Sequence, residues 1–214
     1  MSRWPPGTRQ RLETAALELF TLQGFVDTTV PQITARAGLT TRTFFRHFPD
    51  KREVLFAAED ELPALVAALM AEAPAATSPM ALIAWGLDVV ARTRFDGQRE
   101  HLGMRRAVIR TDEGLREREL RKLAVLSTAI SEAFRTRGLD QLTSTLAGQS
   151  AVVVLDTAVD RWLDQDGERP LTDILHNTLA ALRSMTADGS GDRRLATQRG
   201  RWRNAGTPHP SVRK

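Results

Sequence analysis

Glycine and proline punctuate the first fifty positions so closely that most helices there are too short to persist alone. Gly24 and Gly38 each follow an apolar helical pattern, where glycine commonly ends a helix. Pro31 falls in the first turn of one segment, where its missing N–H is tolerated, and Pro49 closes the next segment. Because isolated helices shorter than about 12 residues are marginal in water, these segments must pack against one another. The pattern predicts a small bundle of short helices.

Side chains suited to capping mark where these helices begin. Thr29 is followed three positions later by Gln32, which is the capping-box pattern, and Asp50 with Glu53 repeats it. Thr40 offers a hydroxyl at the start of a further segment. The helices expected from these signals cover residues 8–23, 29–37 and 41–47, with a fourth that opens at Asp50 and continues through Leu62.

The rest of the chain reads as a succession of longer helices. Apolar residues recur at three- and four-residue spacing, without the sustained alternation of strands. We expect Pro63 to kink or interrupt the fourth helix and residues 74–79 to form a linker. The remaining helices are expected at 79–95, 99–110, 113–136, 140–165 and 170–186. The chain is therefore predicted to be all-α, with an N-terminal three-helix domain at 8–58 and a C-terminal helical domain at 59–186.

Charge is distributed unevenly along the chain. Residues 1–51 carry a net charge of +3, residues 52–186 a net charge of −4, and residues 187–214 a net charge of +5. Basic ends around an acidic middle indicate a polyanionic partner at the ends. The last segment has little to bury and is predicted to be a basic disordered tail, and residues 1–7 a flexible arm.

Composition and motifs argue against an enzyme or a metal protein. The chain has no cysteine, and its four histidines lie in distant segments. It lacks H-E-x-x-H, a phosphate-cradling glycine loop and the G-x-S-x-G elbow. We therefore expect no catalytic activity, no cofactor and no metal. Neither a signal core nor an apolar run of 18 residues is present, which predicts a cytoplasmic protein with no membrane partner.

The expected helix at 41–47 has the properties of a DNA-reading element. It follows a glycine turn, so residues 29–48 match a helix-turn-helix, and about eight residues span about 12 Å, similar to the width of the major groove. Phe44 and Phe48, one turn apart, can anchor it, and Arg42 can pair with guanine. The helix-start threonines and a lysine suit phosphate oxygens. The candidate DNA contacts are Thr29, Thr40, Thr41, Arg42, Thr43, Phe45, Arg46 and Lys51.

This region resembles the N-terminal DNA-binding domain of the tetracycline-repressor (TetR) family. The resemblance covers about residues 8–58 and rests on the ordered blocks AALELF, GF followed by TTV, QITARAG and LTTRTFFRHFPDK. It implies a phosphate contact at His47. The family usually has tyrosine where this chain has Phe45, which keeps an apolar contact and loses a hydroxyl hydrogen bond.

The later helices resemble the C-terminal half of that family in layout and length, which implies a ligand pocket and a dimer interface made by the last two helices. The sequence supports a dimer independently, because the last helix has an apolar stripe and the preceding helix is apolar on more than one face. A symmetric homodimer would present two reading helices to a palindromic operator of double-stranded DNA. The candidate interface residues are Val154, Ala158, Trp162, Leu171, Leu175, Thr178, Leu182 and Met185.

The resemblance further implies a repressor that a small-molecule effector releases from its operator. Candidate pocket residues are Trp85, Phe95, His101, Met104 and Trp162, although aromatic and methionine side chains at helical spacing also suit an ordinary core. The alternative is a helical ligand-binding or interaction protein that binds no operator.

Overall fold

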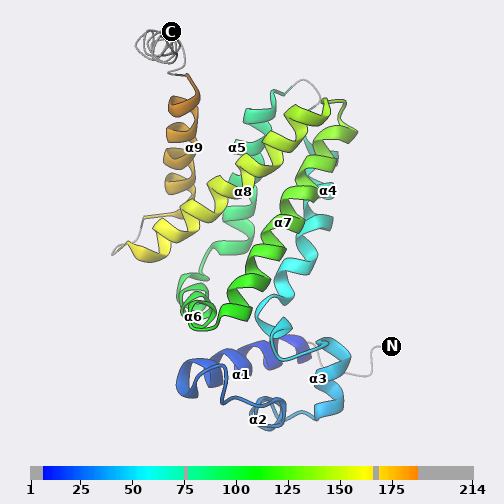
Figure 1. Ribbon diagram of the computed structural model, residues 1–214, viewed down its shortest axis with the longest axis vertical. Coiled ribbons are helices and arrows are strands. Elements are labelled where there is room, and N and C mark those ends of the chain that lie inside the picture. The colour runs from blue at the N-terminus through cyan, green and yellow to red at the C-terminus, as the bar shows by residue number, and fades with distance from the viewer. Residues whose placement is uncertain (1–6, 75–76, 166–168, 188–214) are drawn as a thin grey trace, which may run out of the picture.

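The computed structural model describes residues 7–74, 77–165 and 169–187, and within these ranges every regular element is helical. The expectation of an all-α chain is confirmed. Figure 1 shows two parts, a small N-terminal head and a longer helical body. The α-helices are α1 (Thr8–Gln23), α2 (Val30–Arg36), α3 (Thr41–His47), α4 (Leu62–Glu72), α5 (Pro79–Val90), α6 (Arg99–Arg110), α7 (Glu113–Thr136), α8 (Gln141–Asp164) and α9 (Leu171–Ala187).

The head, formed by α1 to α3, is built around buried aromatic and aliphatic side chains. Phe20, Ile33 and Phe44 come from its three helices and are almost fully buried. The core is closed from the body side by Ile109 at the end of α6 and Leu115 at the start of α7, both 0% exposed. The head therefore rests on the body through shared apolar packing.

A second apolar cluster holds the body together, and it draws on α5, α7, α8 and α9. Phe134 of α7 and Ala158 of α8 are fully buried in it, and Leu175 brings α9 against them. The long helices α7 and α8 lie beside each other through much of the body (Figure 1).

A glycine sets the close approach of α7 and α8. A Cβ atom placed on Gly148 of α8 would lie 2.2 Å from the Ser131 hydroxyl and 2.5 Å from the Ser127 carbonyl oxygen, both of α7. Such distances are shorter than van der Waals contact, and the carbonyl belongs to the backbone and cannot rotate away. Glycine is therefore required at this crossing for steric reasons.

The segment between α3 and α4 differs from the expected continuous helix. Two 3₁₀ turns, Glu53–Leu55 and Ala57–Glu61, precede α4, and Pro63 lies in the first turn of α4. An α-helix running through Pro63 would lose a hydrogen bond and bring its ring against the carbonyl of residue 59. The proline therefore starts a new helix here, so the expected fourth helix is interrupted at Pro63 and not kinked.

The other helix boundaries agree closely with the sequence expectations. The one departure lies at the end of the helix expected over 79–95, where Ala91–Phe95 winds as a π-helix after α5. The expected tail at 187–214 lies almost entirely outside the described residues, as do residues 1–6 of the expected arm.

Among the described residues, α8 is the one helix long and apolar enough to cross a membrane by length and composition. It packs against α7 and α9 in the body, and Val154, Ala158 and Trp162 are buried there. This packing accounts for part of its apolar composition, and Leu142, Leu146 and Val153 of the same helix are exposed.

Candidate nucleic-acid interface

Helix α2 begins at a complete capping box. The Thr29 hydroxyl accepts a hydrogen bond from the Gln32 N–H at 3.4 Å, and the Gln32 side-chain carbonyl accepts one from the Thr29 N–H at 2.7 Å. Both groups belong to residues that the sequence singled out, so the capping prediction is confirmed. Thr29 is exposed beyond this pairing.

The turn between α2 and α3 depends on Gly38. Its φ of +63° lies in the left-handed region, which L-residues with a side chain rarely adopt. The turn is closed by the Leu39 N–H, which donates to the Thr34 carbonyl oxygen at 2.8 Å. Arg11 of α1 donates to the Ala37 carbonyl beside it. The helix-turn-helix at 29–48 is therefore present, and its turn is fastened to α1.

Helix α3 is anchored by two phenylalanines. Phe44 and Phe48 are 0% and 1% exposed, and their ring centroids are 5.3 Å apart. Phe45 stands on the other side, 55% exposed, with its ring edge-on to Phe44 at 5.4 Å. The sequence expectation about the inward and outward phenylalanines is confirmed.

The outer face of α3 is formed by polar residues and Phe45. Thr41, Arg42 and Arg46 are exposed, as is the capping residue Thr40. Thr43, which the sequence placed with them, is buried, with 3% of its surface exposed and its hydroxyl 3.0 Å from that of Thr40. The expectation for Thr43 is wrong because the buried face of a helix is about 100° wide and takes in the position before Phe44.

His47 lies at the end of α3 and is half-buried. Burial lowers the pKa of its imidazole, and the positive charges of Arg46 and Arg9 lower it further. The ring is therefore less protonated near neutral pH than a free histidine. Near neutral pH His47 can offer a neutral N–H donor to a phosphate more readily than a cation.

Lys51 departs from its expected role as a cation directed at the DNA backbone. Its ammonium donates to the carbonyl oxygens of Phe25 at 2.6 Å, Thr28 at 2.7 Å and Val26 at 3.3 Å. It also lies 4.2 Å from the centroid of the Phe25 ring. The expectation is corrected because three backbone carbonyls already face the ammonium. The sequence could not predict this role, because every residue has a backbone carbonyl and no residue type indicates which carbonyls will face the lysine.

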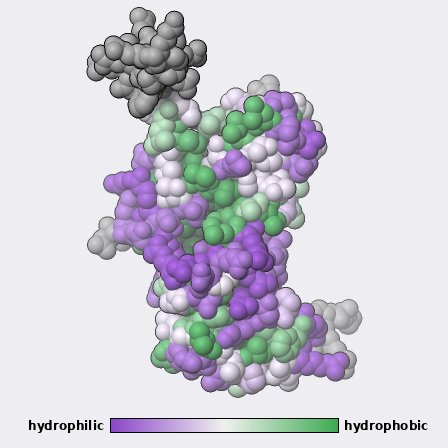
Figure 2. Space-filling view, viewed as in Figure 1, coloured by the Kyte–Doolittle hydropathy of each residue, from purple (hydrophilic) through white to green (hydrophobic). Residues whose placement is uncertain are grey.

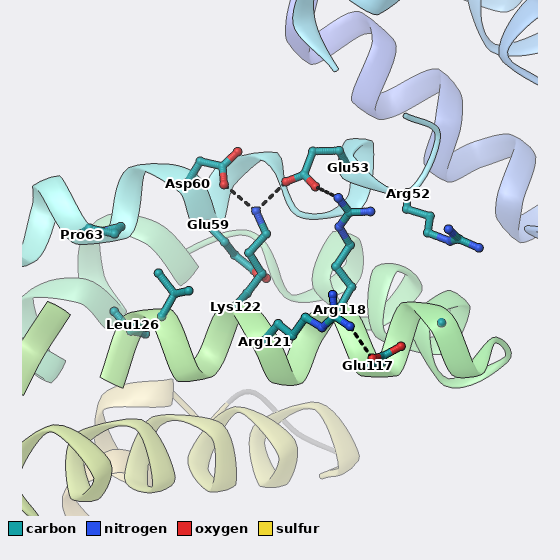
Figure 3. A pocket seen from close by; sticks show the side chains of 12 residues that line it. Arg52, Glu53, Glu59, Asp60, Pro63, Glu117, Arg118, Arg121, Lys122 and Leu126 are labelled. Atoms are coloured by element: carbon teal, nitrogen blue, oxygen red, sulfur yellow. Dashed lines mark hydrogen bonds and ion pairs between the residues drawn. The ribbon is translucent and has the colours of Figure 1, made fainter. Parts of the chain in front are cut away.

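A charged groove of about 550 Å³ separates the segment after α3 from α7. The Glu53 carboxylate lies 2.8 Å from Arg118 and 2.5 Å from Lys122, and Lys122 also lies 2.5 Å from Asp60. Figure 3 shows Lys122 between the two carboxylates. The Asp50 side chain accepts from the Glu53 N–H at 2.9 Å. Only half of the expected second capping box is thus formed: Asp50 caps the turn, whereas the Glu53 carboxylate pairs with residues of α7. The opposed charges of the groove join the head to the body. Figure 2 shows a hydrophilic belt where the two parts meet.

The five candidate pocket residues are not gathered around one cavity. Phe95 and Trp162 meet edge to face with ring centroids 6.4 Å apart, and Trp85 packs against the same body cluster. Met104 packs against the head cluster, and His101 is exposed. Met104 and His101 of α6 therefore lie apart from the aromatic group around Trp162, and their contact with a ligand stays a prediction.

Most of the candidate interface residues are buried inside one protomer. Because α9 packs on α5 and α8, the apolar stripe that the sequence assigned to a partner faces the chain's own core. Leu182 is half-buried and Met185 is 78% exposed. The interface prediction is wrong for Val154, Ala158, Trp162, Leu171, Leu175 and Thr178. The exposed apolar residues of α8 are instead Leu142, Leu146 and Val153.

Solved structures share this helical architecture. A transcriptional regulator from Pseudomonas aeruginosa PAO1 matches with a TM-score of 0.62 at 16% identity, over 87% of this chain and 94% of that one. A TetR-family regulator from Syntrophomonas wolfei matches with a TM-score of 0.60 at 12% identity, over 84% and 95%. At such identities the likeness shows the shared fold alone.

Sequence comparison points the same way. The regulator TcmR of Streptomyces glaucescens is 33% identical over 140 residues, which is 62% of each chain. SrpR of Pseudomonas putida is 50% identical over 48 residues, which is 22% of each chain. The chain thus spans less than two thirds of the curated relatives it matches. The family described as bacterial regulatory proteins, tetR family, matches residues 13–58, which contain α2, the turn and α3. The head of this chain therefore matches the tetR family of bacterial regulatory proteins, and the body shares its fold with the solved structures above.

Proposed function

We propose that this chain is a sequence-specific DNA-binding transcriptional regulator that acts in the cytoplasm and inserts α3 into the major groove of its operator. The observation that carries the proposal is the division of α3 into two faces. Phe44 and Phe48 fix the helix to the head, while Arg42 and Phe45 stand exposed on the other side. A rigid helix with a free polar face is the element that reads base edges in helix-turn-helix proteins.

Arg42 is assigned the base-reading role. It makes no ion pair or hydrogen bond within the described part of the chain, so its guanidinium is available for the bidentate pair with guanine. Thr41 and Phe45 flank it and offer apolar groups that suit thymine methyl groups. Phe45 lacks the hydroxyl of the usual tyrosine, so this position contributes packing without a hydrogen bond.

Selection of bound sequences from random double-stranded DNA tests the proposal. The wild-type chain should enrich a palindromic sequence, and Arg42→Ala should lose the preference at one base position of each half-site, a cost of about 1–3 kcal/mol. Arg135→Ala, which removes an exposed arginine of α7, is the matched control and should leave the preference unchanged. If no sequence is enriched by the wild type, the alternative of a helical ligand-binding protein without an operator is correct.

The proposal includes a homodimer formed through the outer face of α8. Leu142, Leu146 and Val153 are 69%, 53% and 58% exposed, and they recur at helical spacing along one side. Met185 of α9 is 78% exposed. Figure 2 shows hydrophobic residues exposed over the visible face of the body. An apolar stripe of this kind on a helix of the body favours association with its copy.

Sedimentation of charge-introducing variants separates this face from other exposed apolar residues. Leu146→Asp and Val153→Asp should turn a dimer into a monomer. Val125→Asp is the control, because Val125 of α7 is 56% exposed and lies outside the proposed face. A variant pair that sediments like wild type would move the interface elsewhere.

We further propose that a small-molecule effector bound in the body releases the chain from DNA. The support is the π-helical turn Ala91–Phe95, since π turns often occur at functional sites. This turn sets Phe95 against Trp162, and the guanidinium of Arg99 lies 5.8 Å from the Trp162 ring. A screen for compounds that release operator DNA would identify the effector. Phe95→Ala should bind DNA as wild type does and respond less to the compound, and an equal response would place the effector elsewhere.

A further inference from the structure

Lys51 fastens the loop that leads into the helix-turn-helix. Its ammonium has three N–H donors, and three carbonyl oxygens, those of Phe25, Val26 and Thr28, lie within 3.3 Å of it. The Phe25 ring lies 4.2 Å from the same ammonium and is itself packed edge-on to Phe20 at 5.1 Å. The donors and acceptors match in number, and the loop is held on both its polar and its aromatic side.

The loop that Lys51 holds ends where α2 begins. Thr28 is 1% exposed, and its hydroxyl donates to the Gly24 carbonyl oxygen at 2.7 Å. The next residue, Thr29, is the N-cap of α2. The path of the backbone at Thr28 therefore determines where α2 starts and how it is directed.

Lys51 also lies just beyond the other end of the motif. Only Phe48, Pro49 and Asp50 separate it from His47, the last residue of α3. Phe48 is buried in the head core, so Lys51 leaves from a fixed point. One side chain thus joins the residue before the helix-turn-helix to the segment directly after it.

We propose that Lys51 is a positioning residue that clasps the two ends of the helix-turn-helix, so that α2 and α3 meet DNA as one rigid unit. The inference rests on the proposed DNA-binding function. It assigns Lys51 a task different from phosphate contact, because its donors are directed at the chain's own backbone. Burial lowers the pKa of Lys51, and the nearby charge of Arg52 lowers it further.

Salt dependence distinguishes the two roles of Lys51. A cation that contacts a phosphate releases a counterion, and each such contact contributes about 0.9 to the slope of log K against log salt. Removing a clasp misdirects α2 and α3 without removing a phosphate-neutralising charge. Lys51→Met should therefore weaken binding to the selected operator by about tenfold or more and leave the slope unchanged. A slope lower by about 0.9 would overturn the inference.

Lys51→Arg also distinguishes the clasp from a phosphate contact, because it keeps the charge and changes the geometry of the donors. Arginine keeps the charge, so a phosphate contact would survive and binding would stay near wild type. The planar guanidinium cannot direct three donors at three carbonyls as the ammonium does. The clasp therefore predicts weaker binding for Lys51→Arg, and wild-type binding would count against it. Arg52→Met is the matched control, because Arg52 is an adjacent exposed cation, and it should bind like wild type.

Amide hydrogen exchange on the full-length free protein tests the clasp without DNA. Lys51→Met should speed exchange at residues 25–33 and leave α8 and α9 unchanged, and unchanged exchange at 25–33 would refute the clasp. If the wild type selects no DNA sequence, the proposed function fails, and the exchange result still decides whether Lys51 holds the loop. If Lys51→Met unfolds the head, the Lys51→Arg protein supplies the same two measurements.

Discussion

The head and the body are built from the same element, the α-helix, yet their sequences specify them to different depths. In the head, a capping threonine, a left-handed glycine and two anchoring phenylalanines set both the helix ends and the helix faces. In the body, the helix ends follow the sequence pattern while the faces do not, since most of the stripe assigned to a partner is buried in one chain. Helix ends are set by local chemistry, whereas a buried face is set by whatever packs against it.

The largest expected contrast lies between two adjacent phenylalanines of the head. Phe44→Ala should lower the free energy of unfolding by about 3–5 kcal/mol, because it empties a fully buried site. Phe45→Ala should lower it by about 1 kcal/mol at most, since only an edge contact between the rings is lost. Denaturant unfolding followed by circular dichroism measures both changes.

At Phe45 the substitution should affect operator affinity more than the free energy of unfolding. Phe45→Ala should weaken operator binding in a protein that remains folded, and Phe45→Leu should restore part of it by returning apolar contact. Equal destabilisation by the two alanine substitutions would contradict the inward and outward assignment of α3.

The second contrast tests the body through two helical glycines. Gly148→Ala should lower the free energy of unfolding by roughly 1–3 kcal/mol, because the added methyl group meets the backbone of α7. Gly86→Ala in α5 has no atom within 4 Å of the added carbon, so it should stabilise the protein by about 0.5–1 kcal/mol. Thermal and denaturant unfolding of the pair give the two signs. A neutral Gly148→Ala would show that α7 and α8 separate at little cost.

Threonine capping offers a third, smaller contrast within the head. Thr40→Ala removes the hydroxyl that accepts from the Thr43 N–H at 3.2 Å and should lower the free energy of unfolding by about 1 kcal/mol. Thr41→Ala, at an exposed first-turn position, should change it by no more than about 0.5 kcal/mol. Both proteins should be compared by denaturant unfolding at neutral pH. A larger loss for Thr41→Ala would remove the capping role from Thr40.

Sequence reasoning identified the features that depend on neighbours along the chain. Helix ends, the capping box at Thr29, the turn at Gly38 and the exposed Arg42 were all predicted from local signals and are confirmed. The resemblance of residues 8–58 to the TetR family was also predicted, and the family match over residues 13–58 confirms it.

The features that sequence reasoning missed depend on groups far away in the chain. Glu53 leaves its expected capping box because Arg118 and Lys122, more than sixty residues later, offer charges to its carboxylate. Lys51 is turned inward by the backbone carbonyls of the segment 25–28. A capping pattern shows which local hydrogen bonds a side chain can make. It does not show whether a charged group elsewhere in the chain offers that side chain a stronger interaction.

The smallest expected effect compares two aspartates near helix starts, Asp50 at the junction of head and body and Asp140 at the start of α8. Burial raises the pKa of Asp50, but the hydrogen bond from the Glu53 N–H and the nearby Arg118 outweigh it and bring the pKa below 3.8. A pKa lowered by folding means that the ionised carboxylate stabilises the native state above the unfolded pKa. That stabilisation is lost as the pH falls through the folded pKa.

Asp50→Asn should therefore flatten the fall in stability below about pH 4, by no more than about 1 kcal/mol because the carboxylate is partly exposed. Asp140→Asn should flatten it too, because the Thr143 side chain and N–H lower the pKa of Asp140. The two variants should differ in which parts of the protein they affect, since Asp50 also forms an ion pair with Arg118 of α7. Acid unfolding followed by head and body reporters should show Asp50→Asn affecting both parts and Asp140→Asn the body alone. Identical responses would mean that the ion pairs across the groove do not couple the two parts.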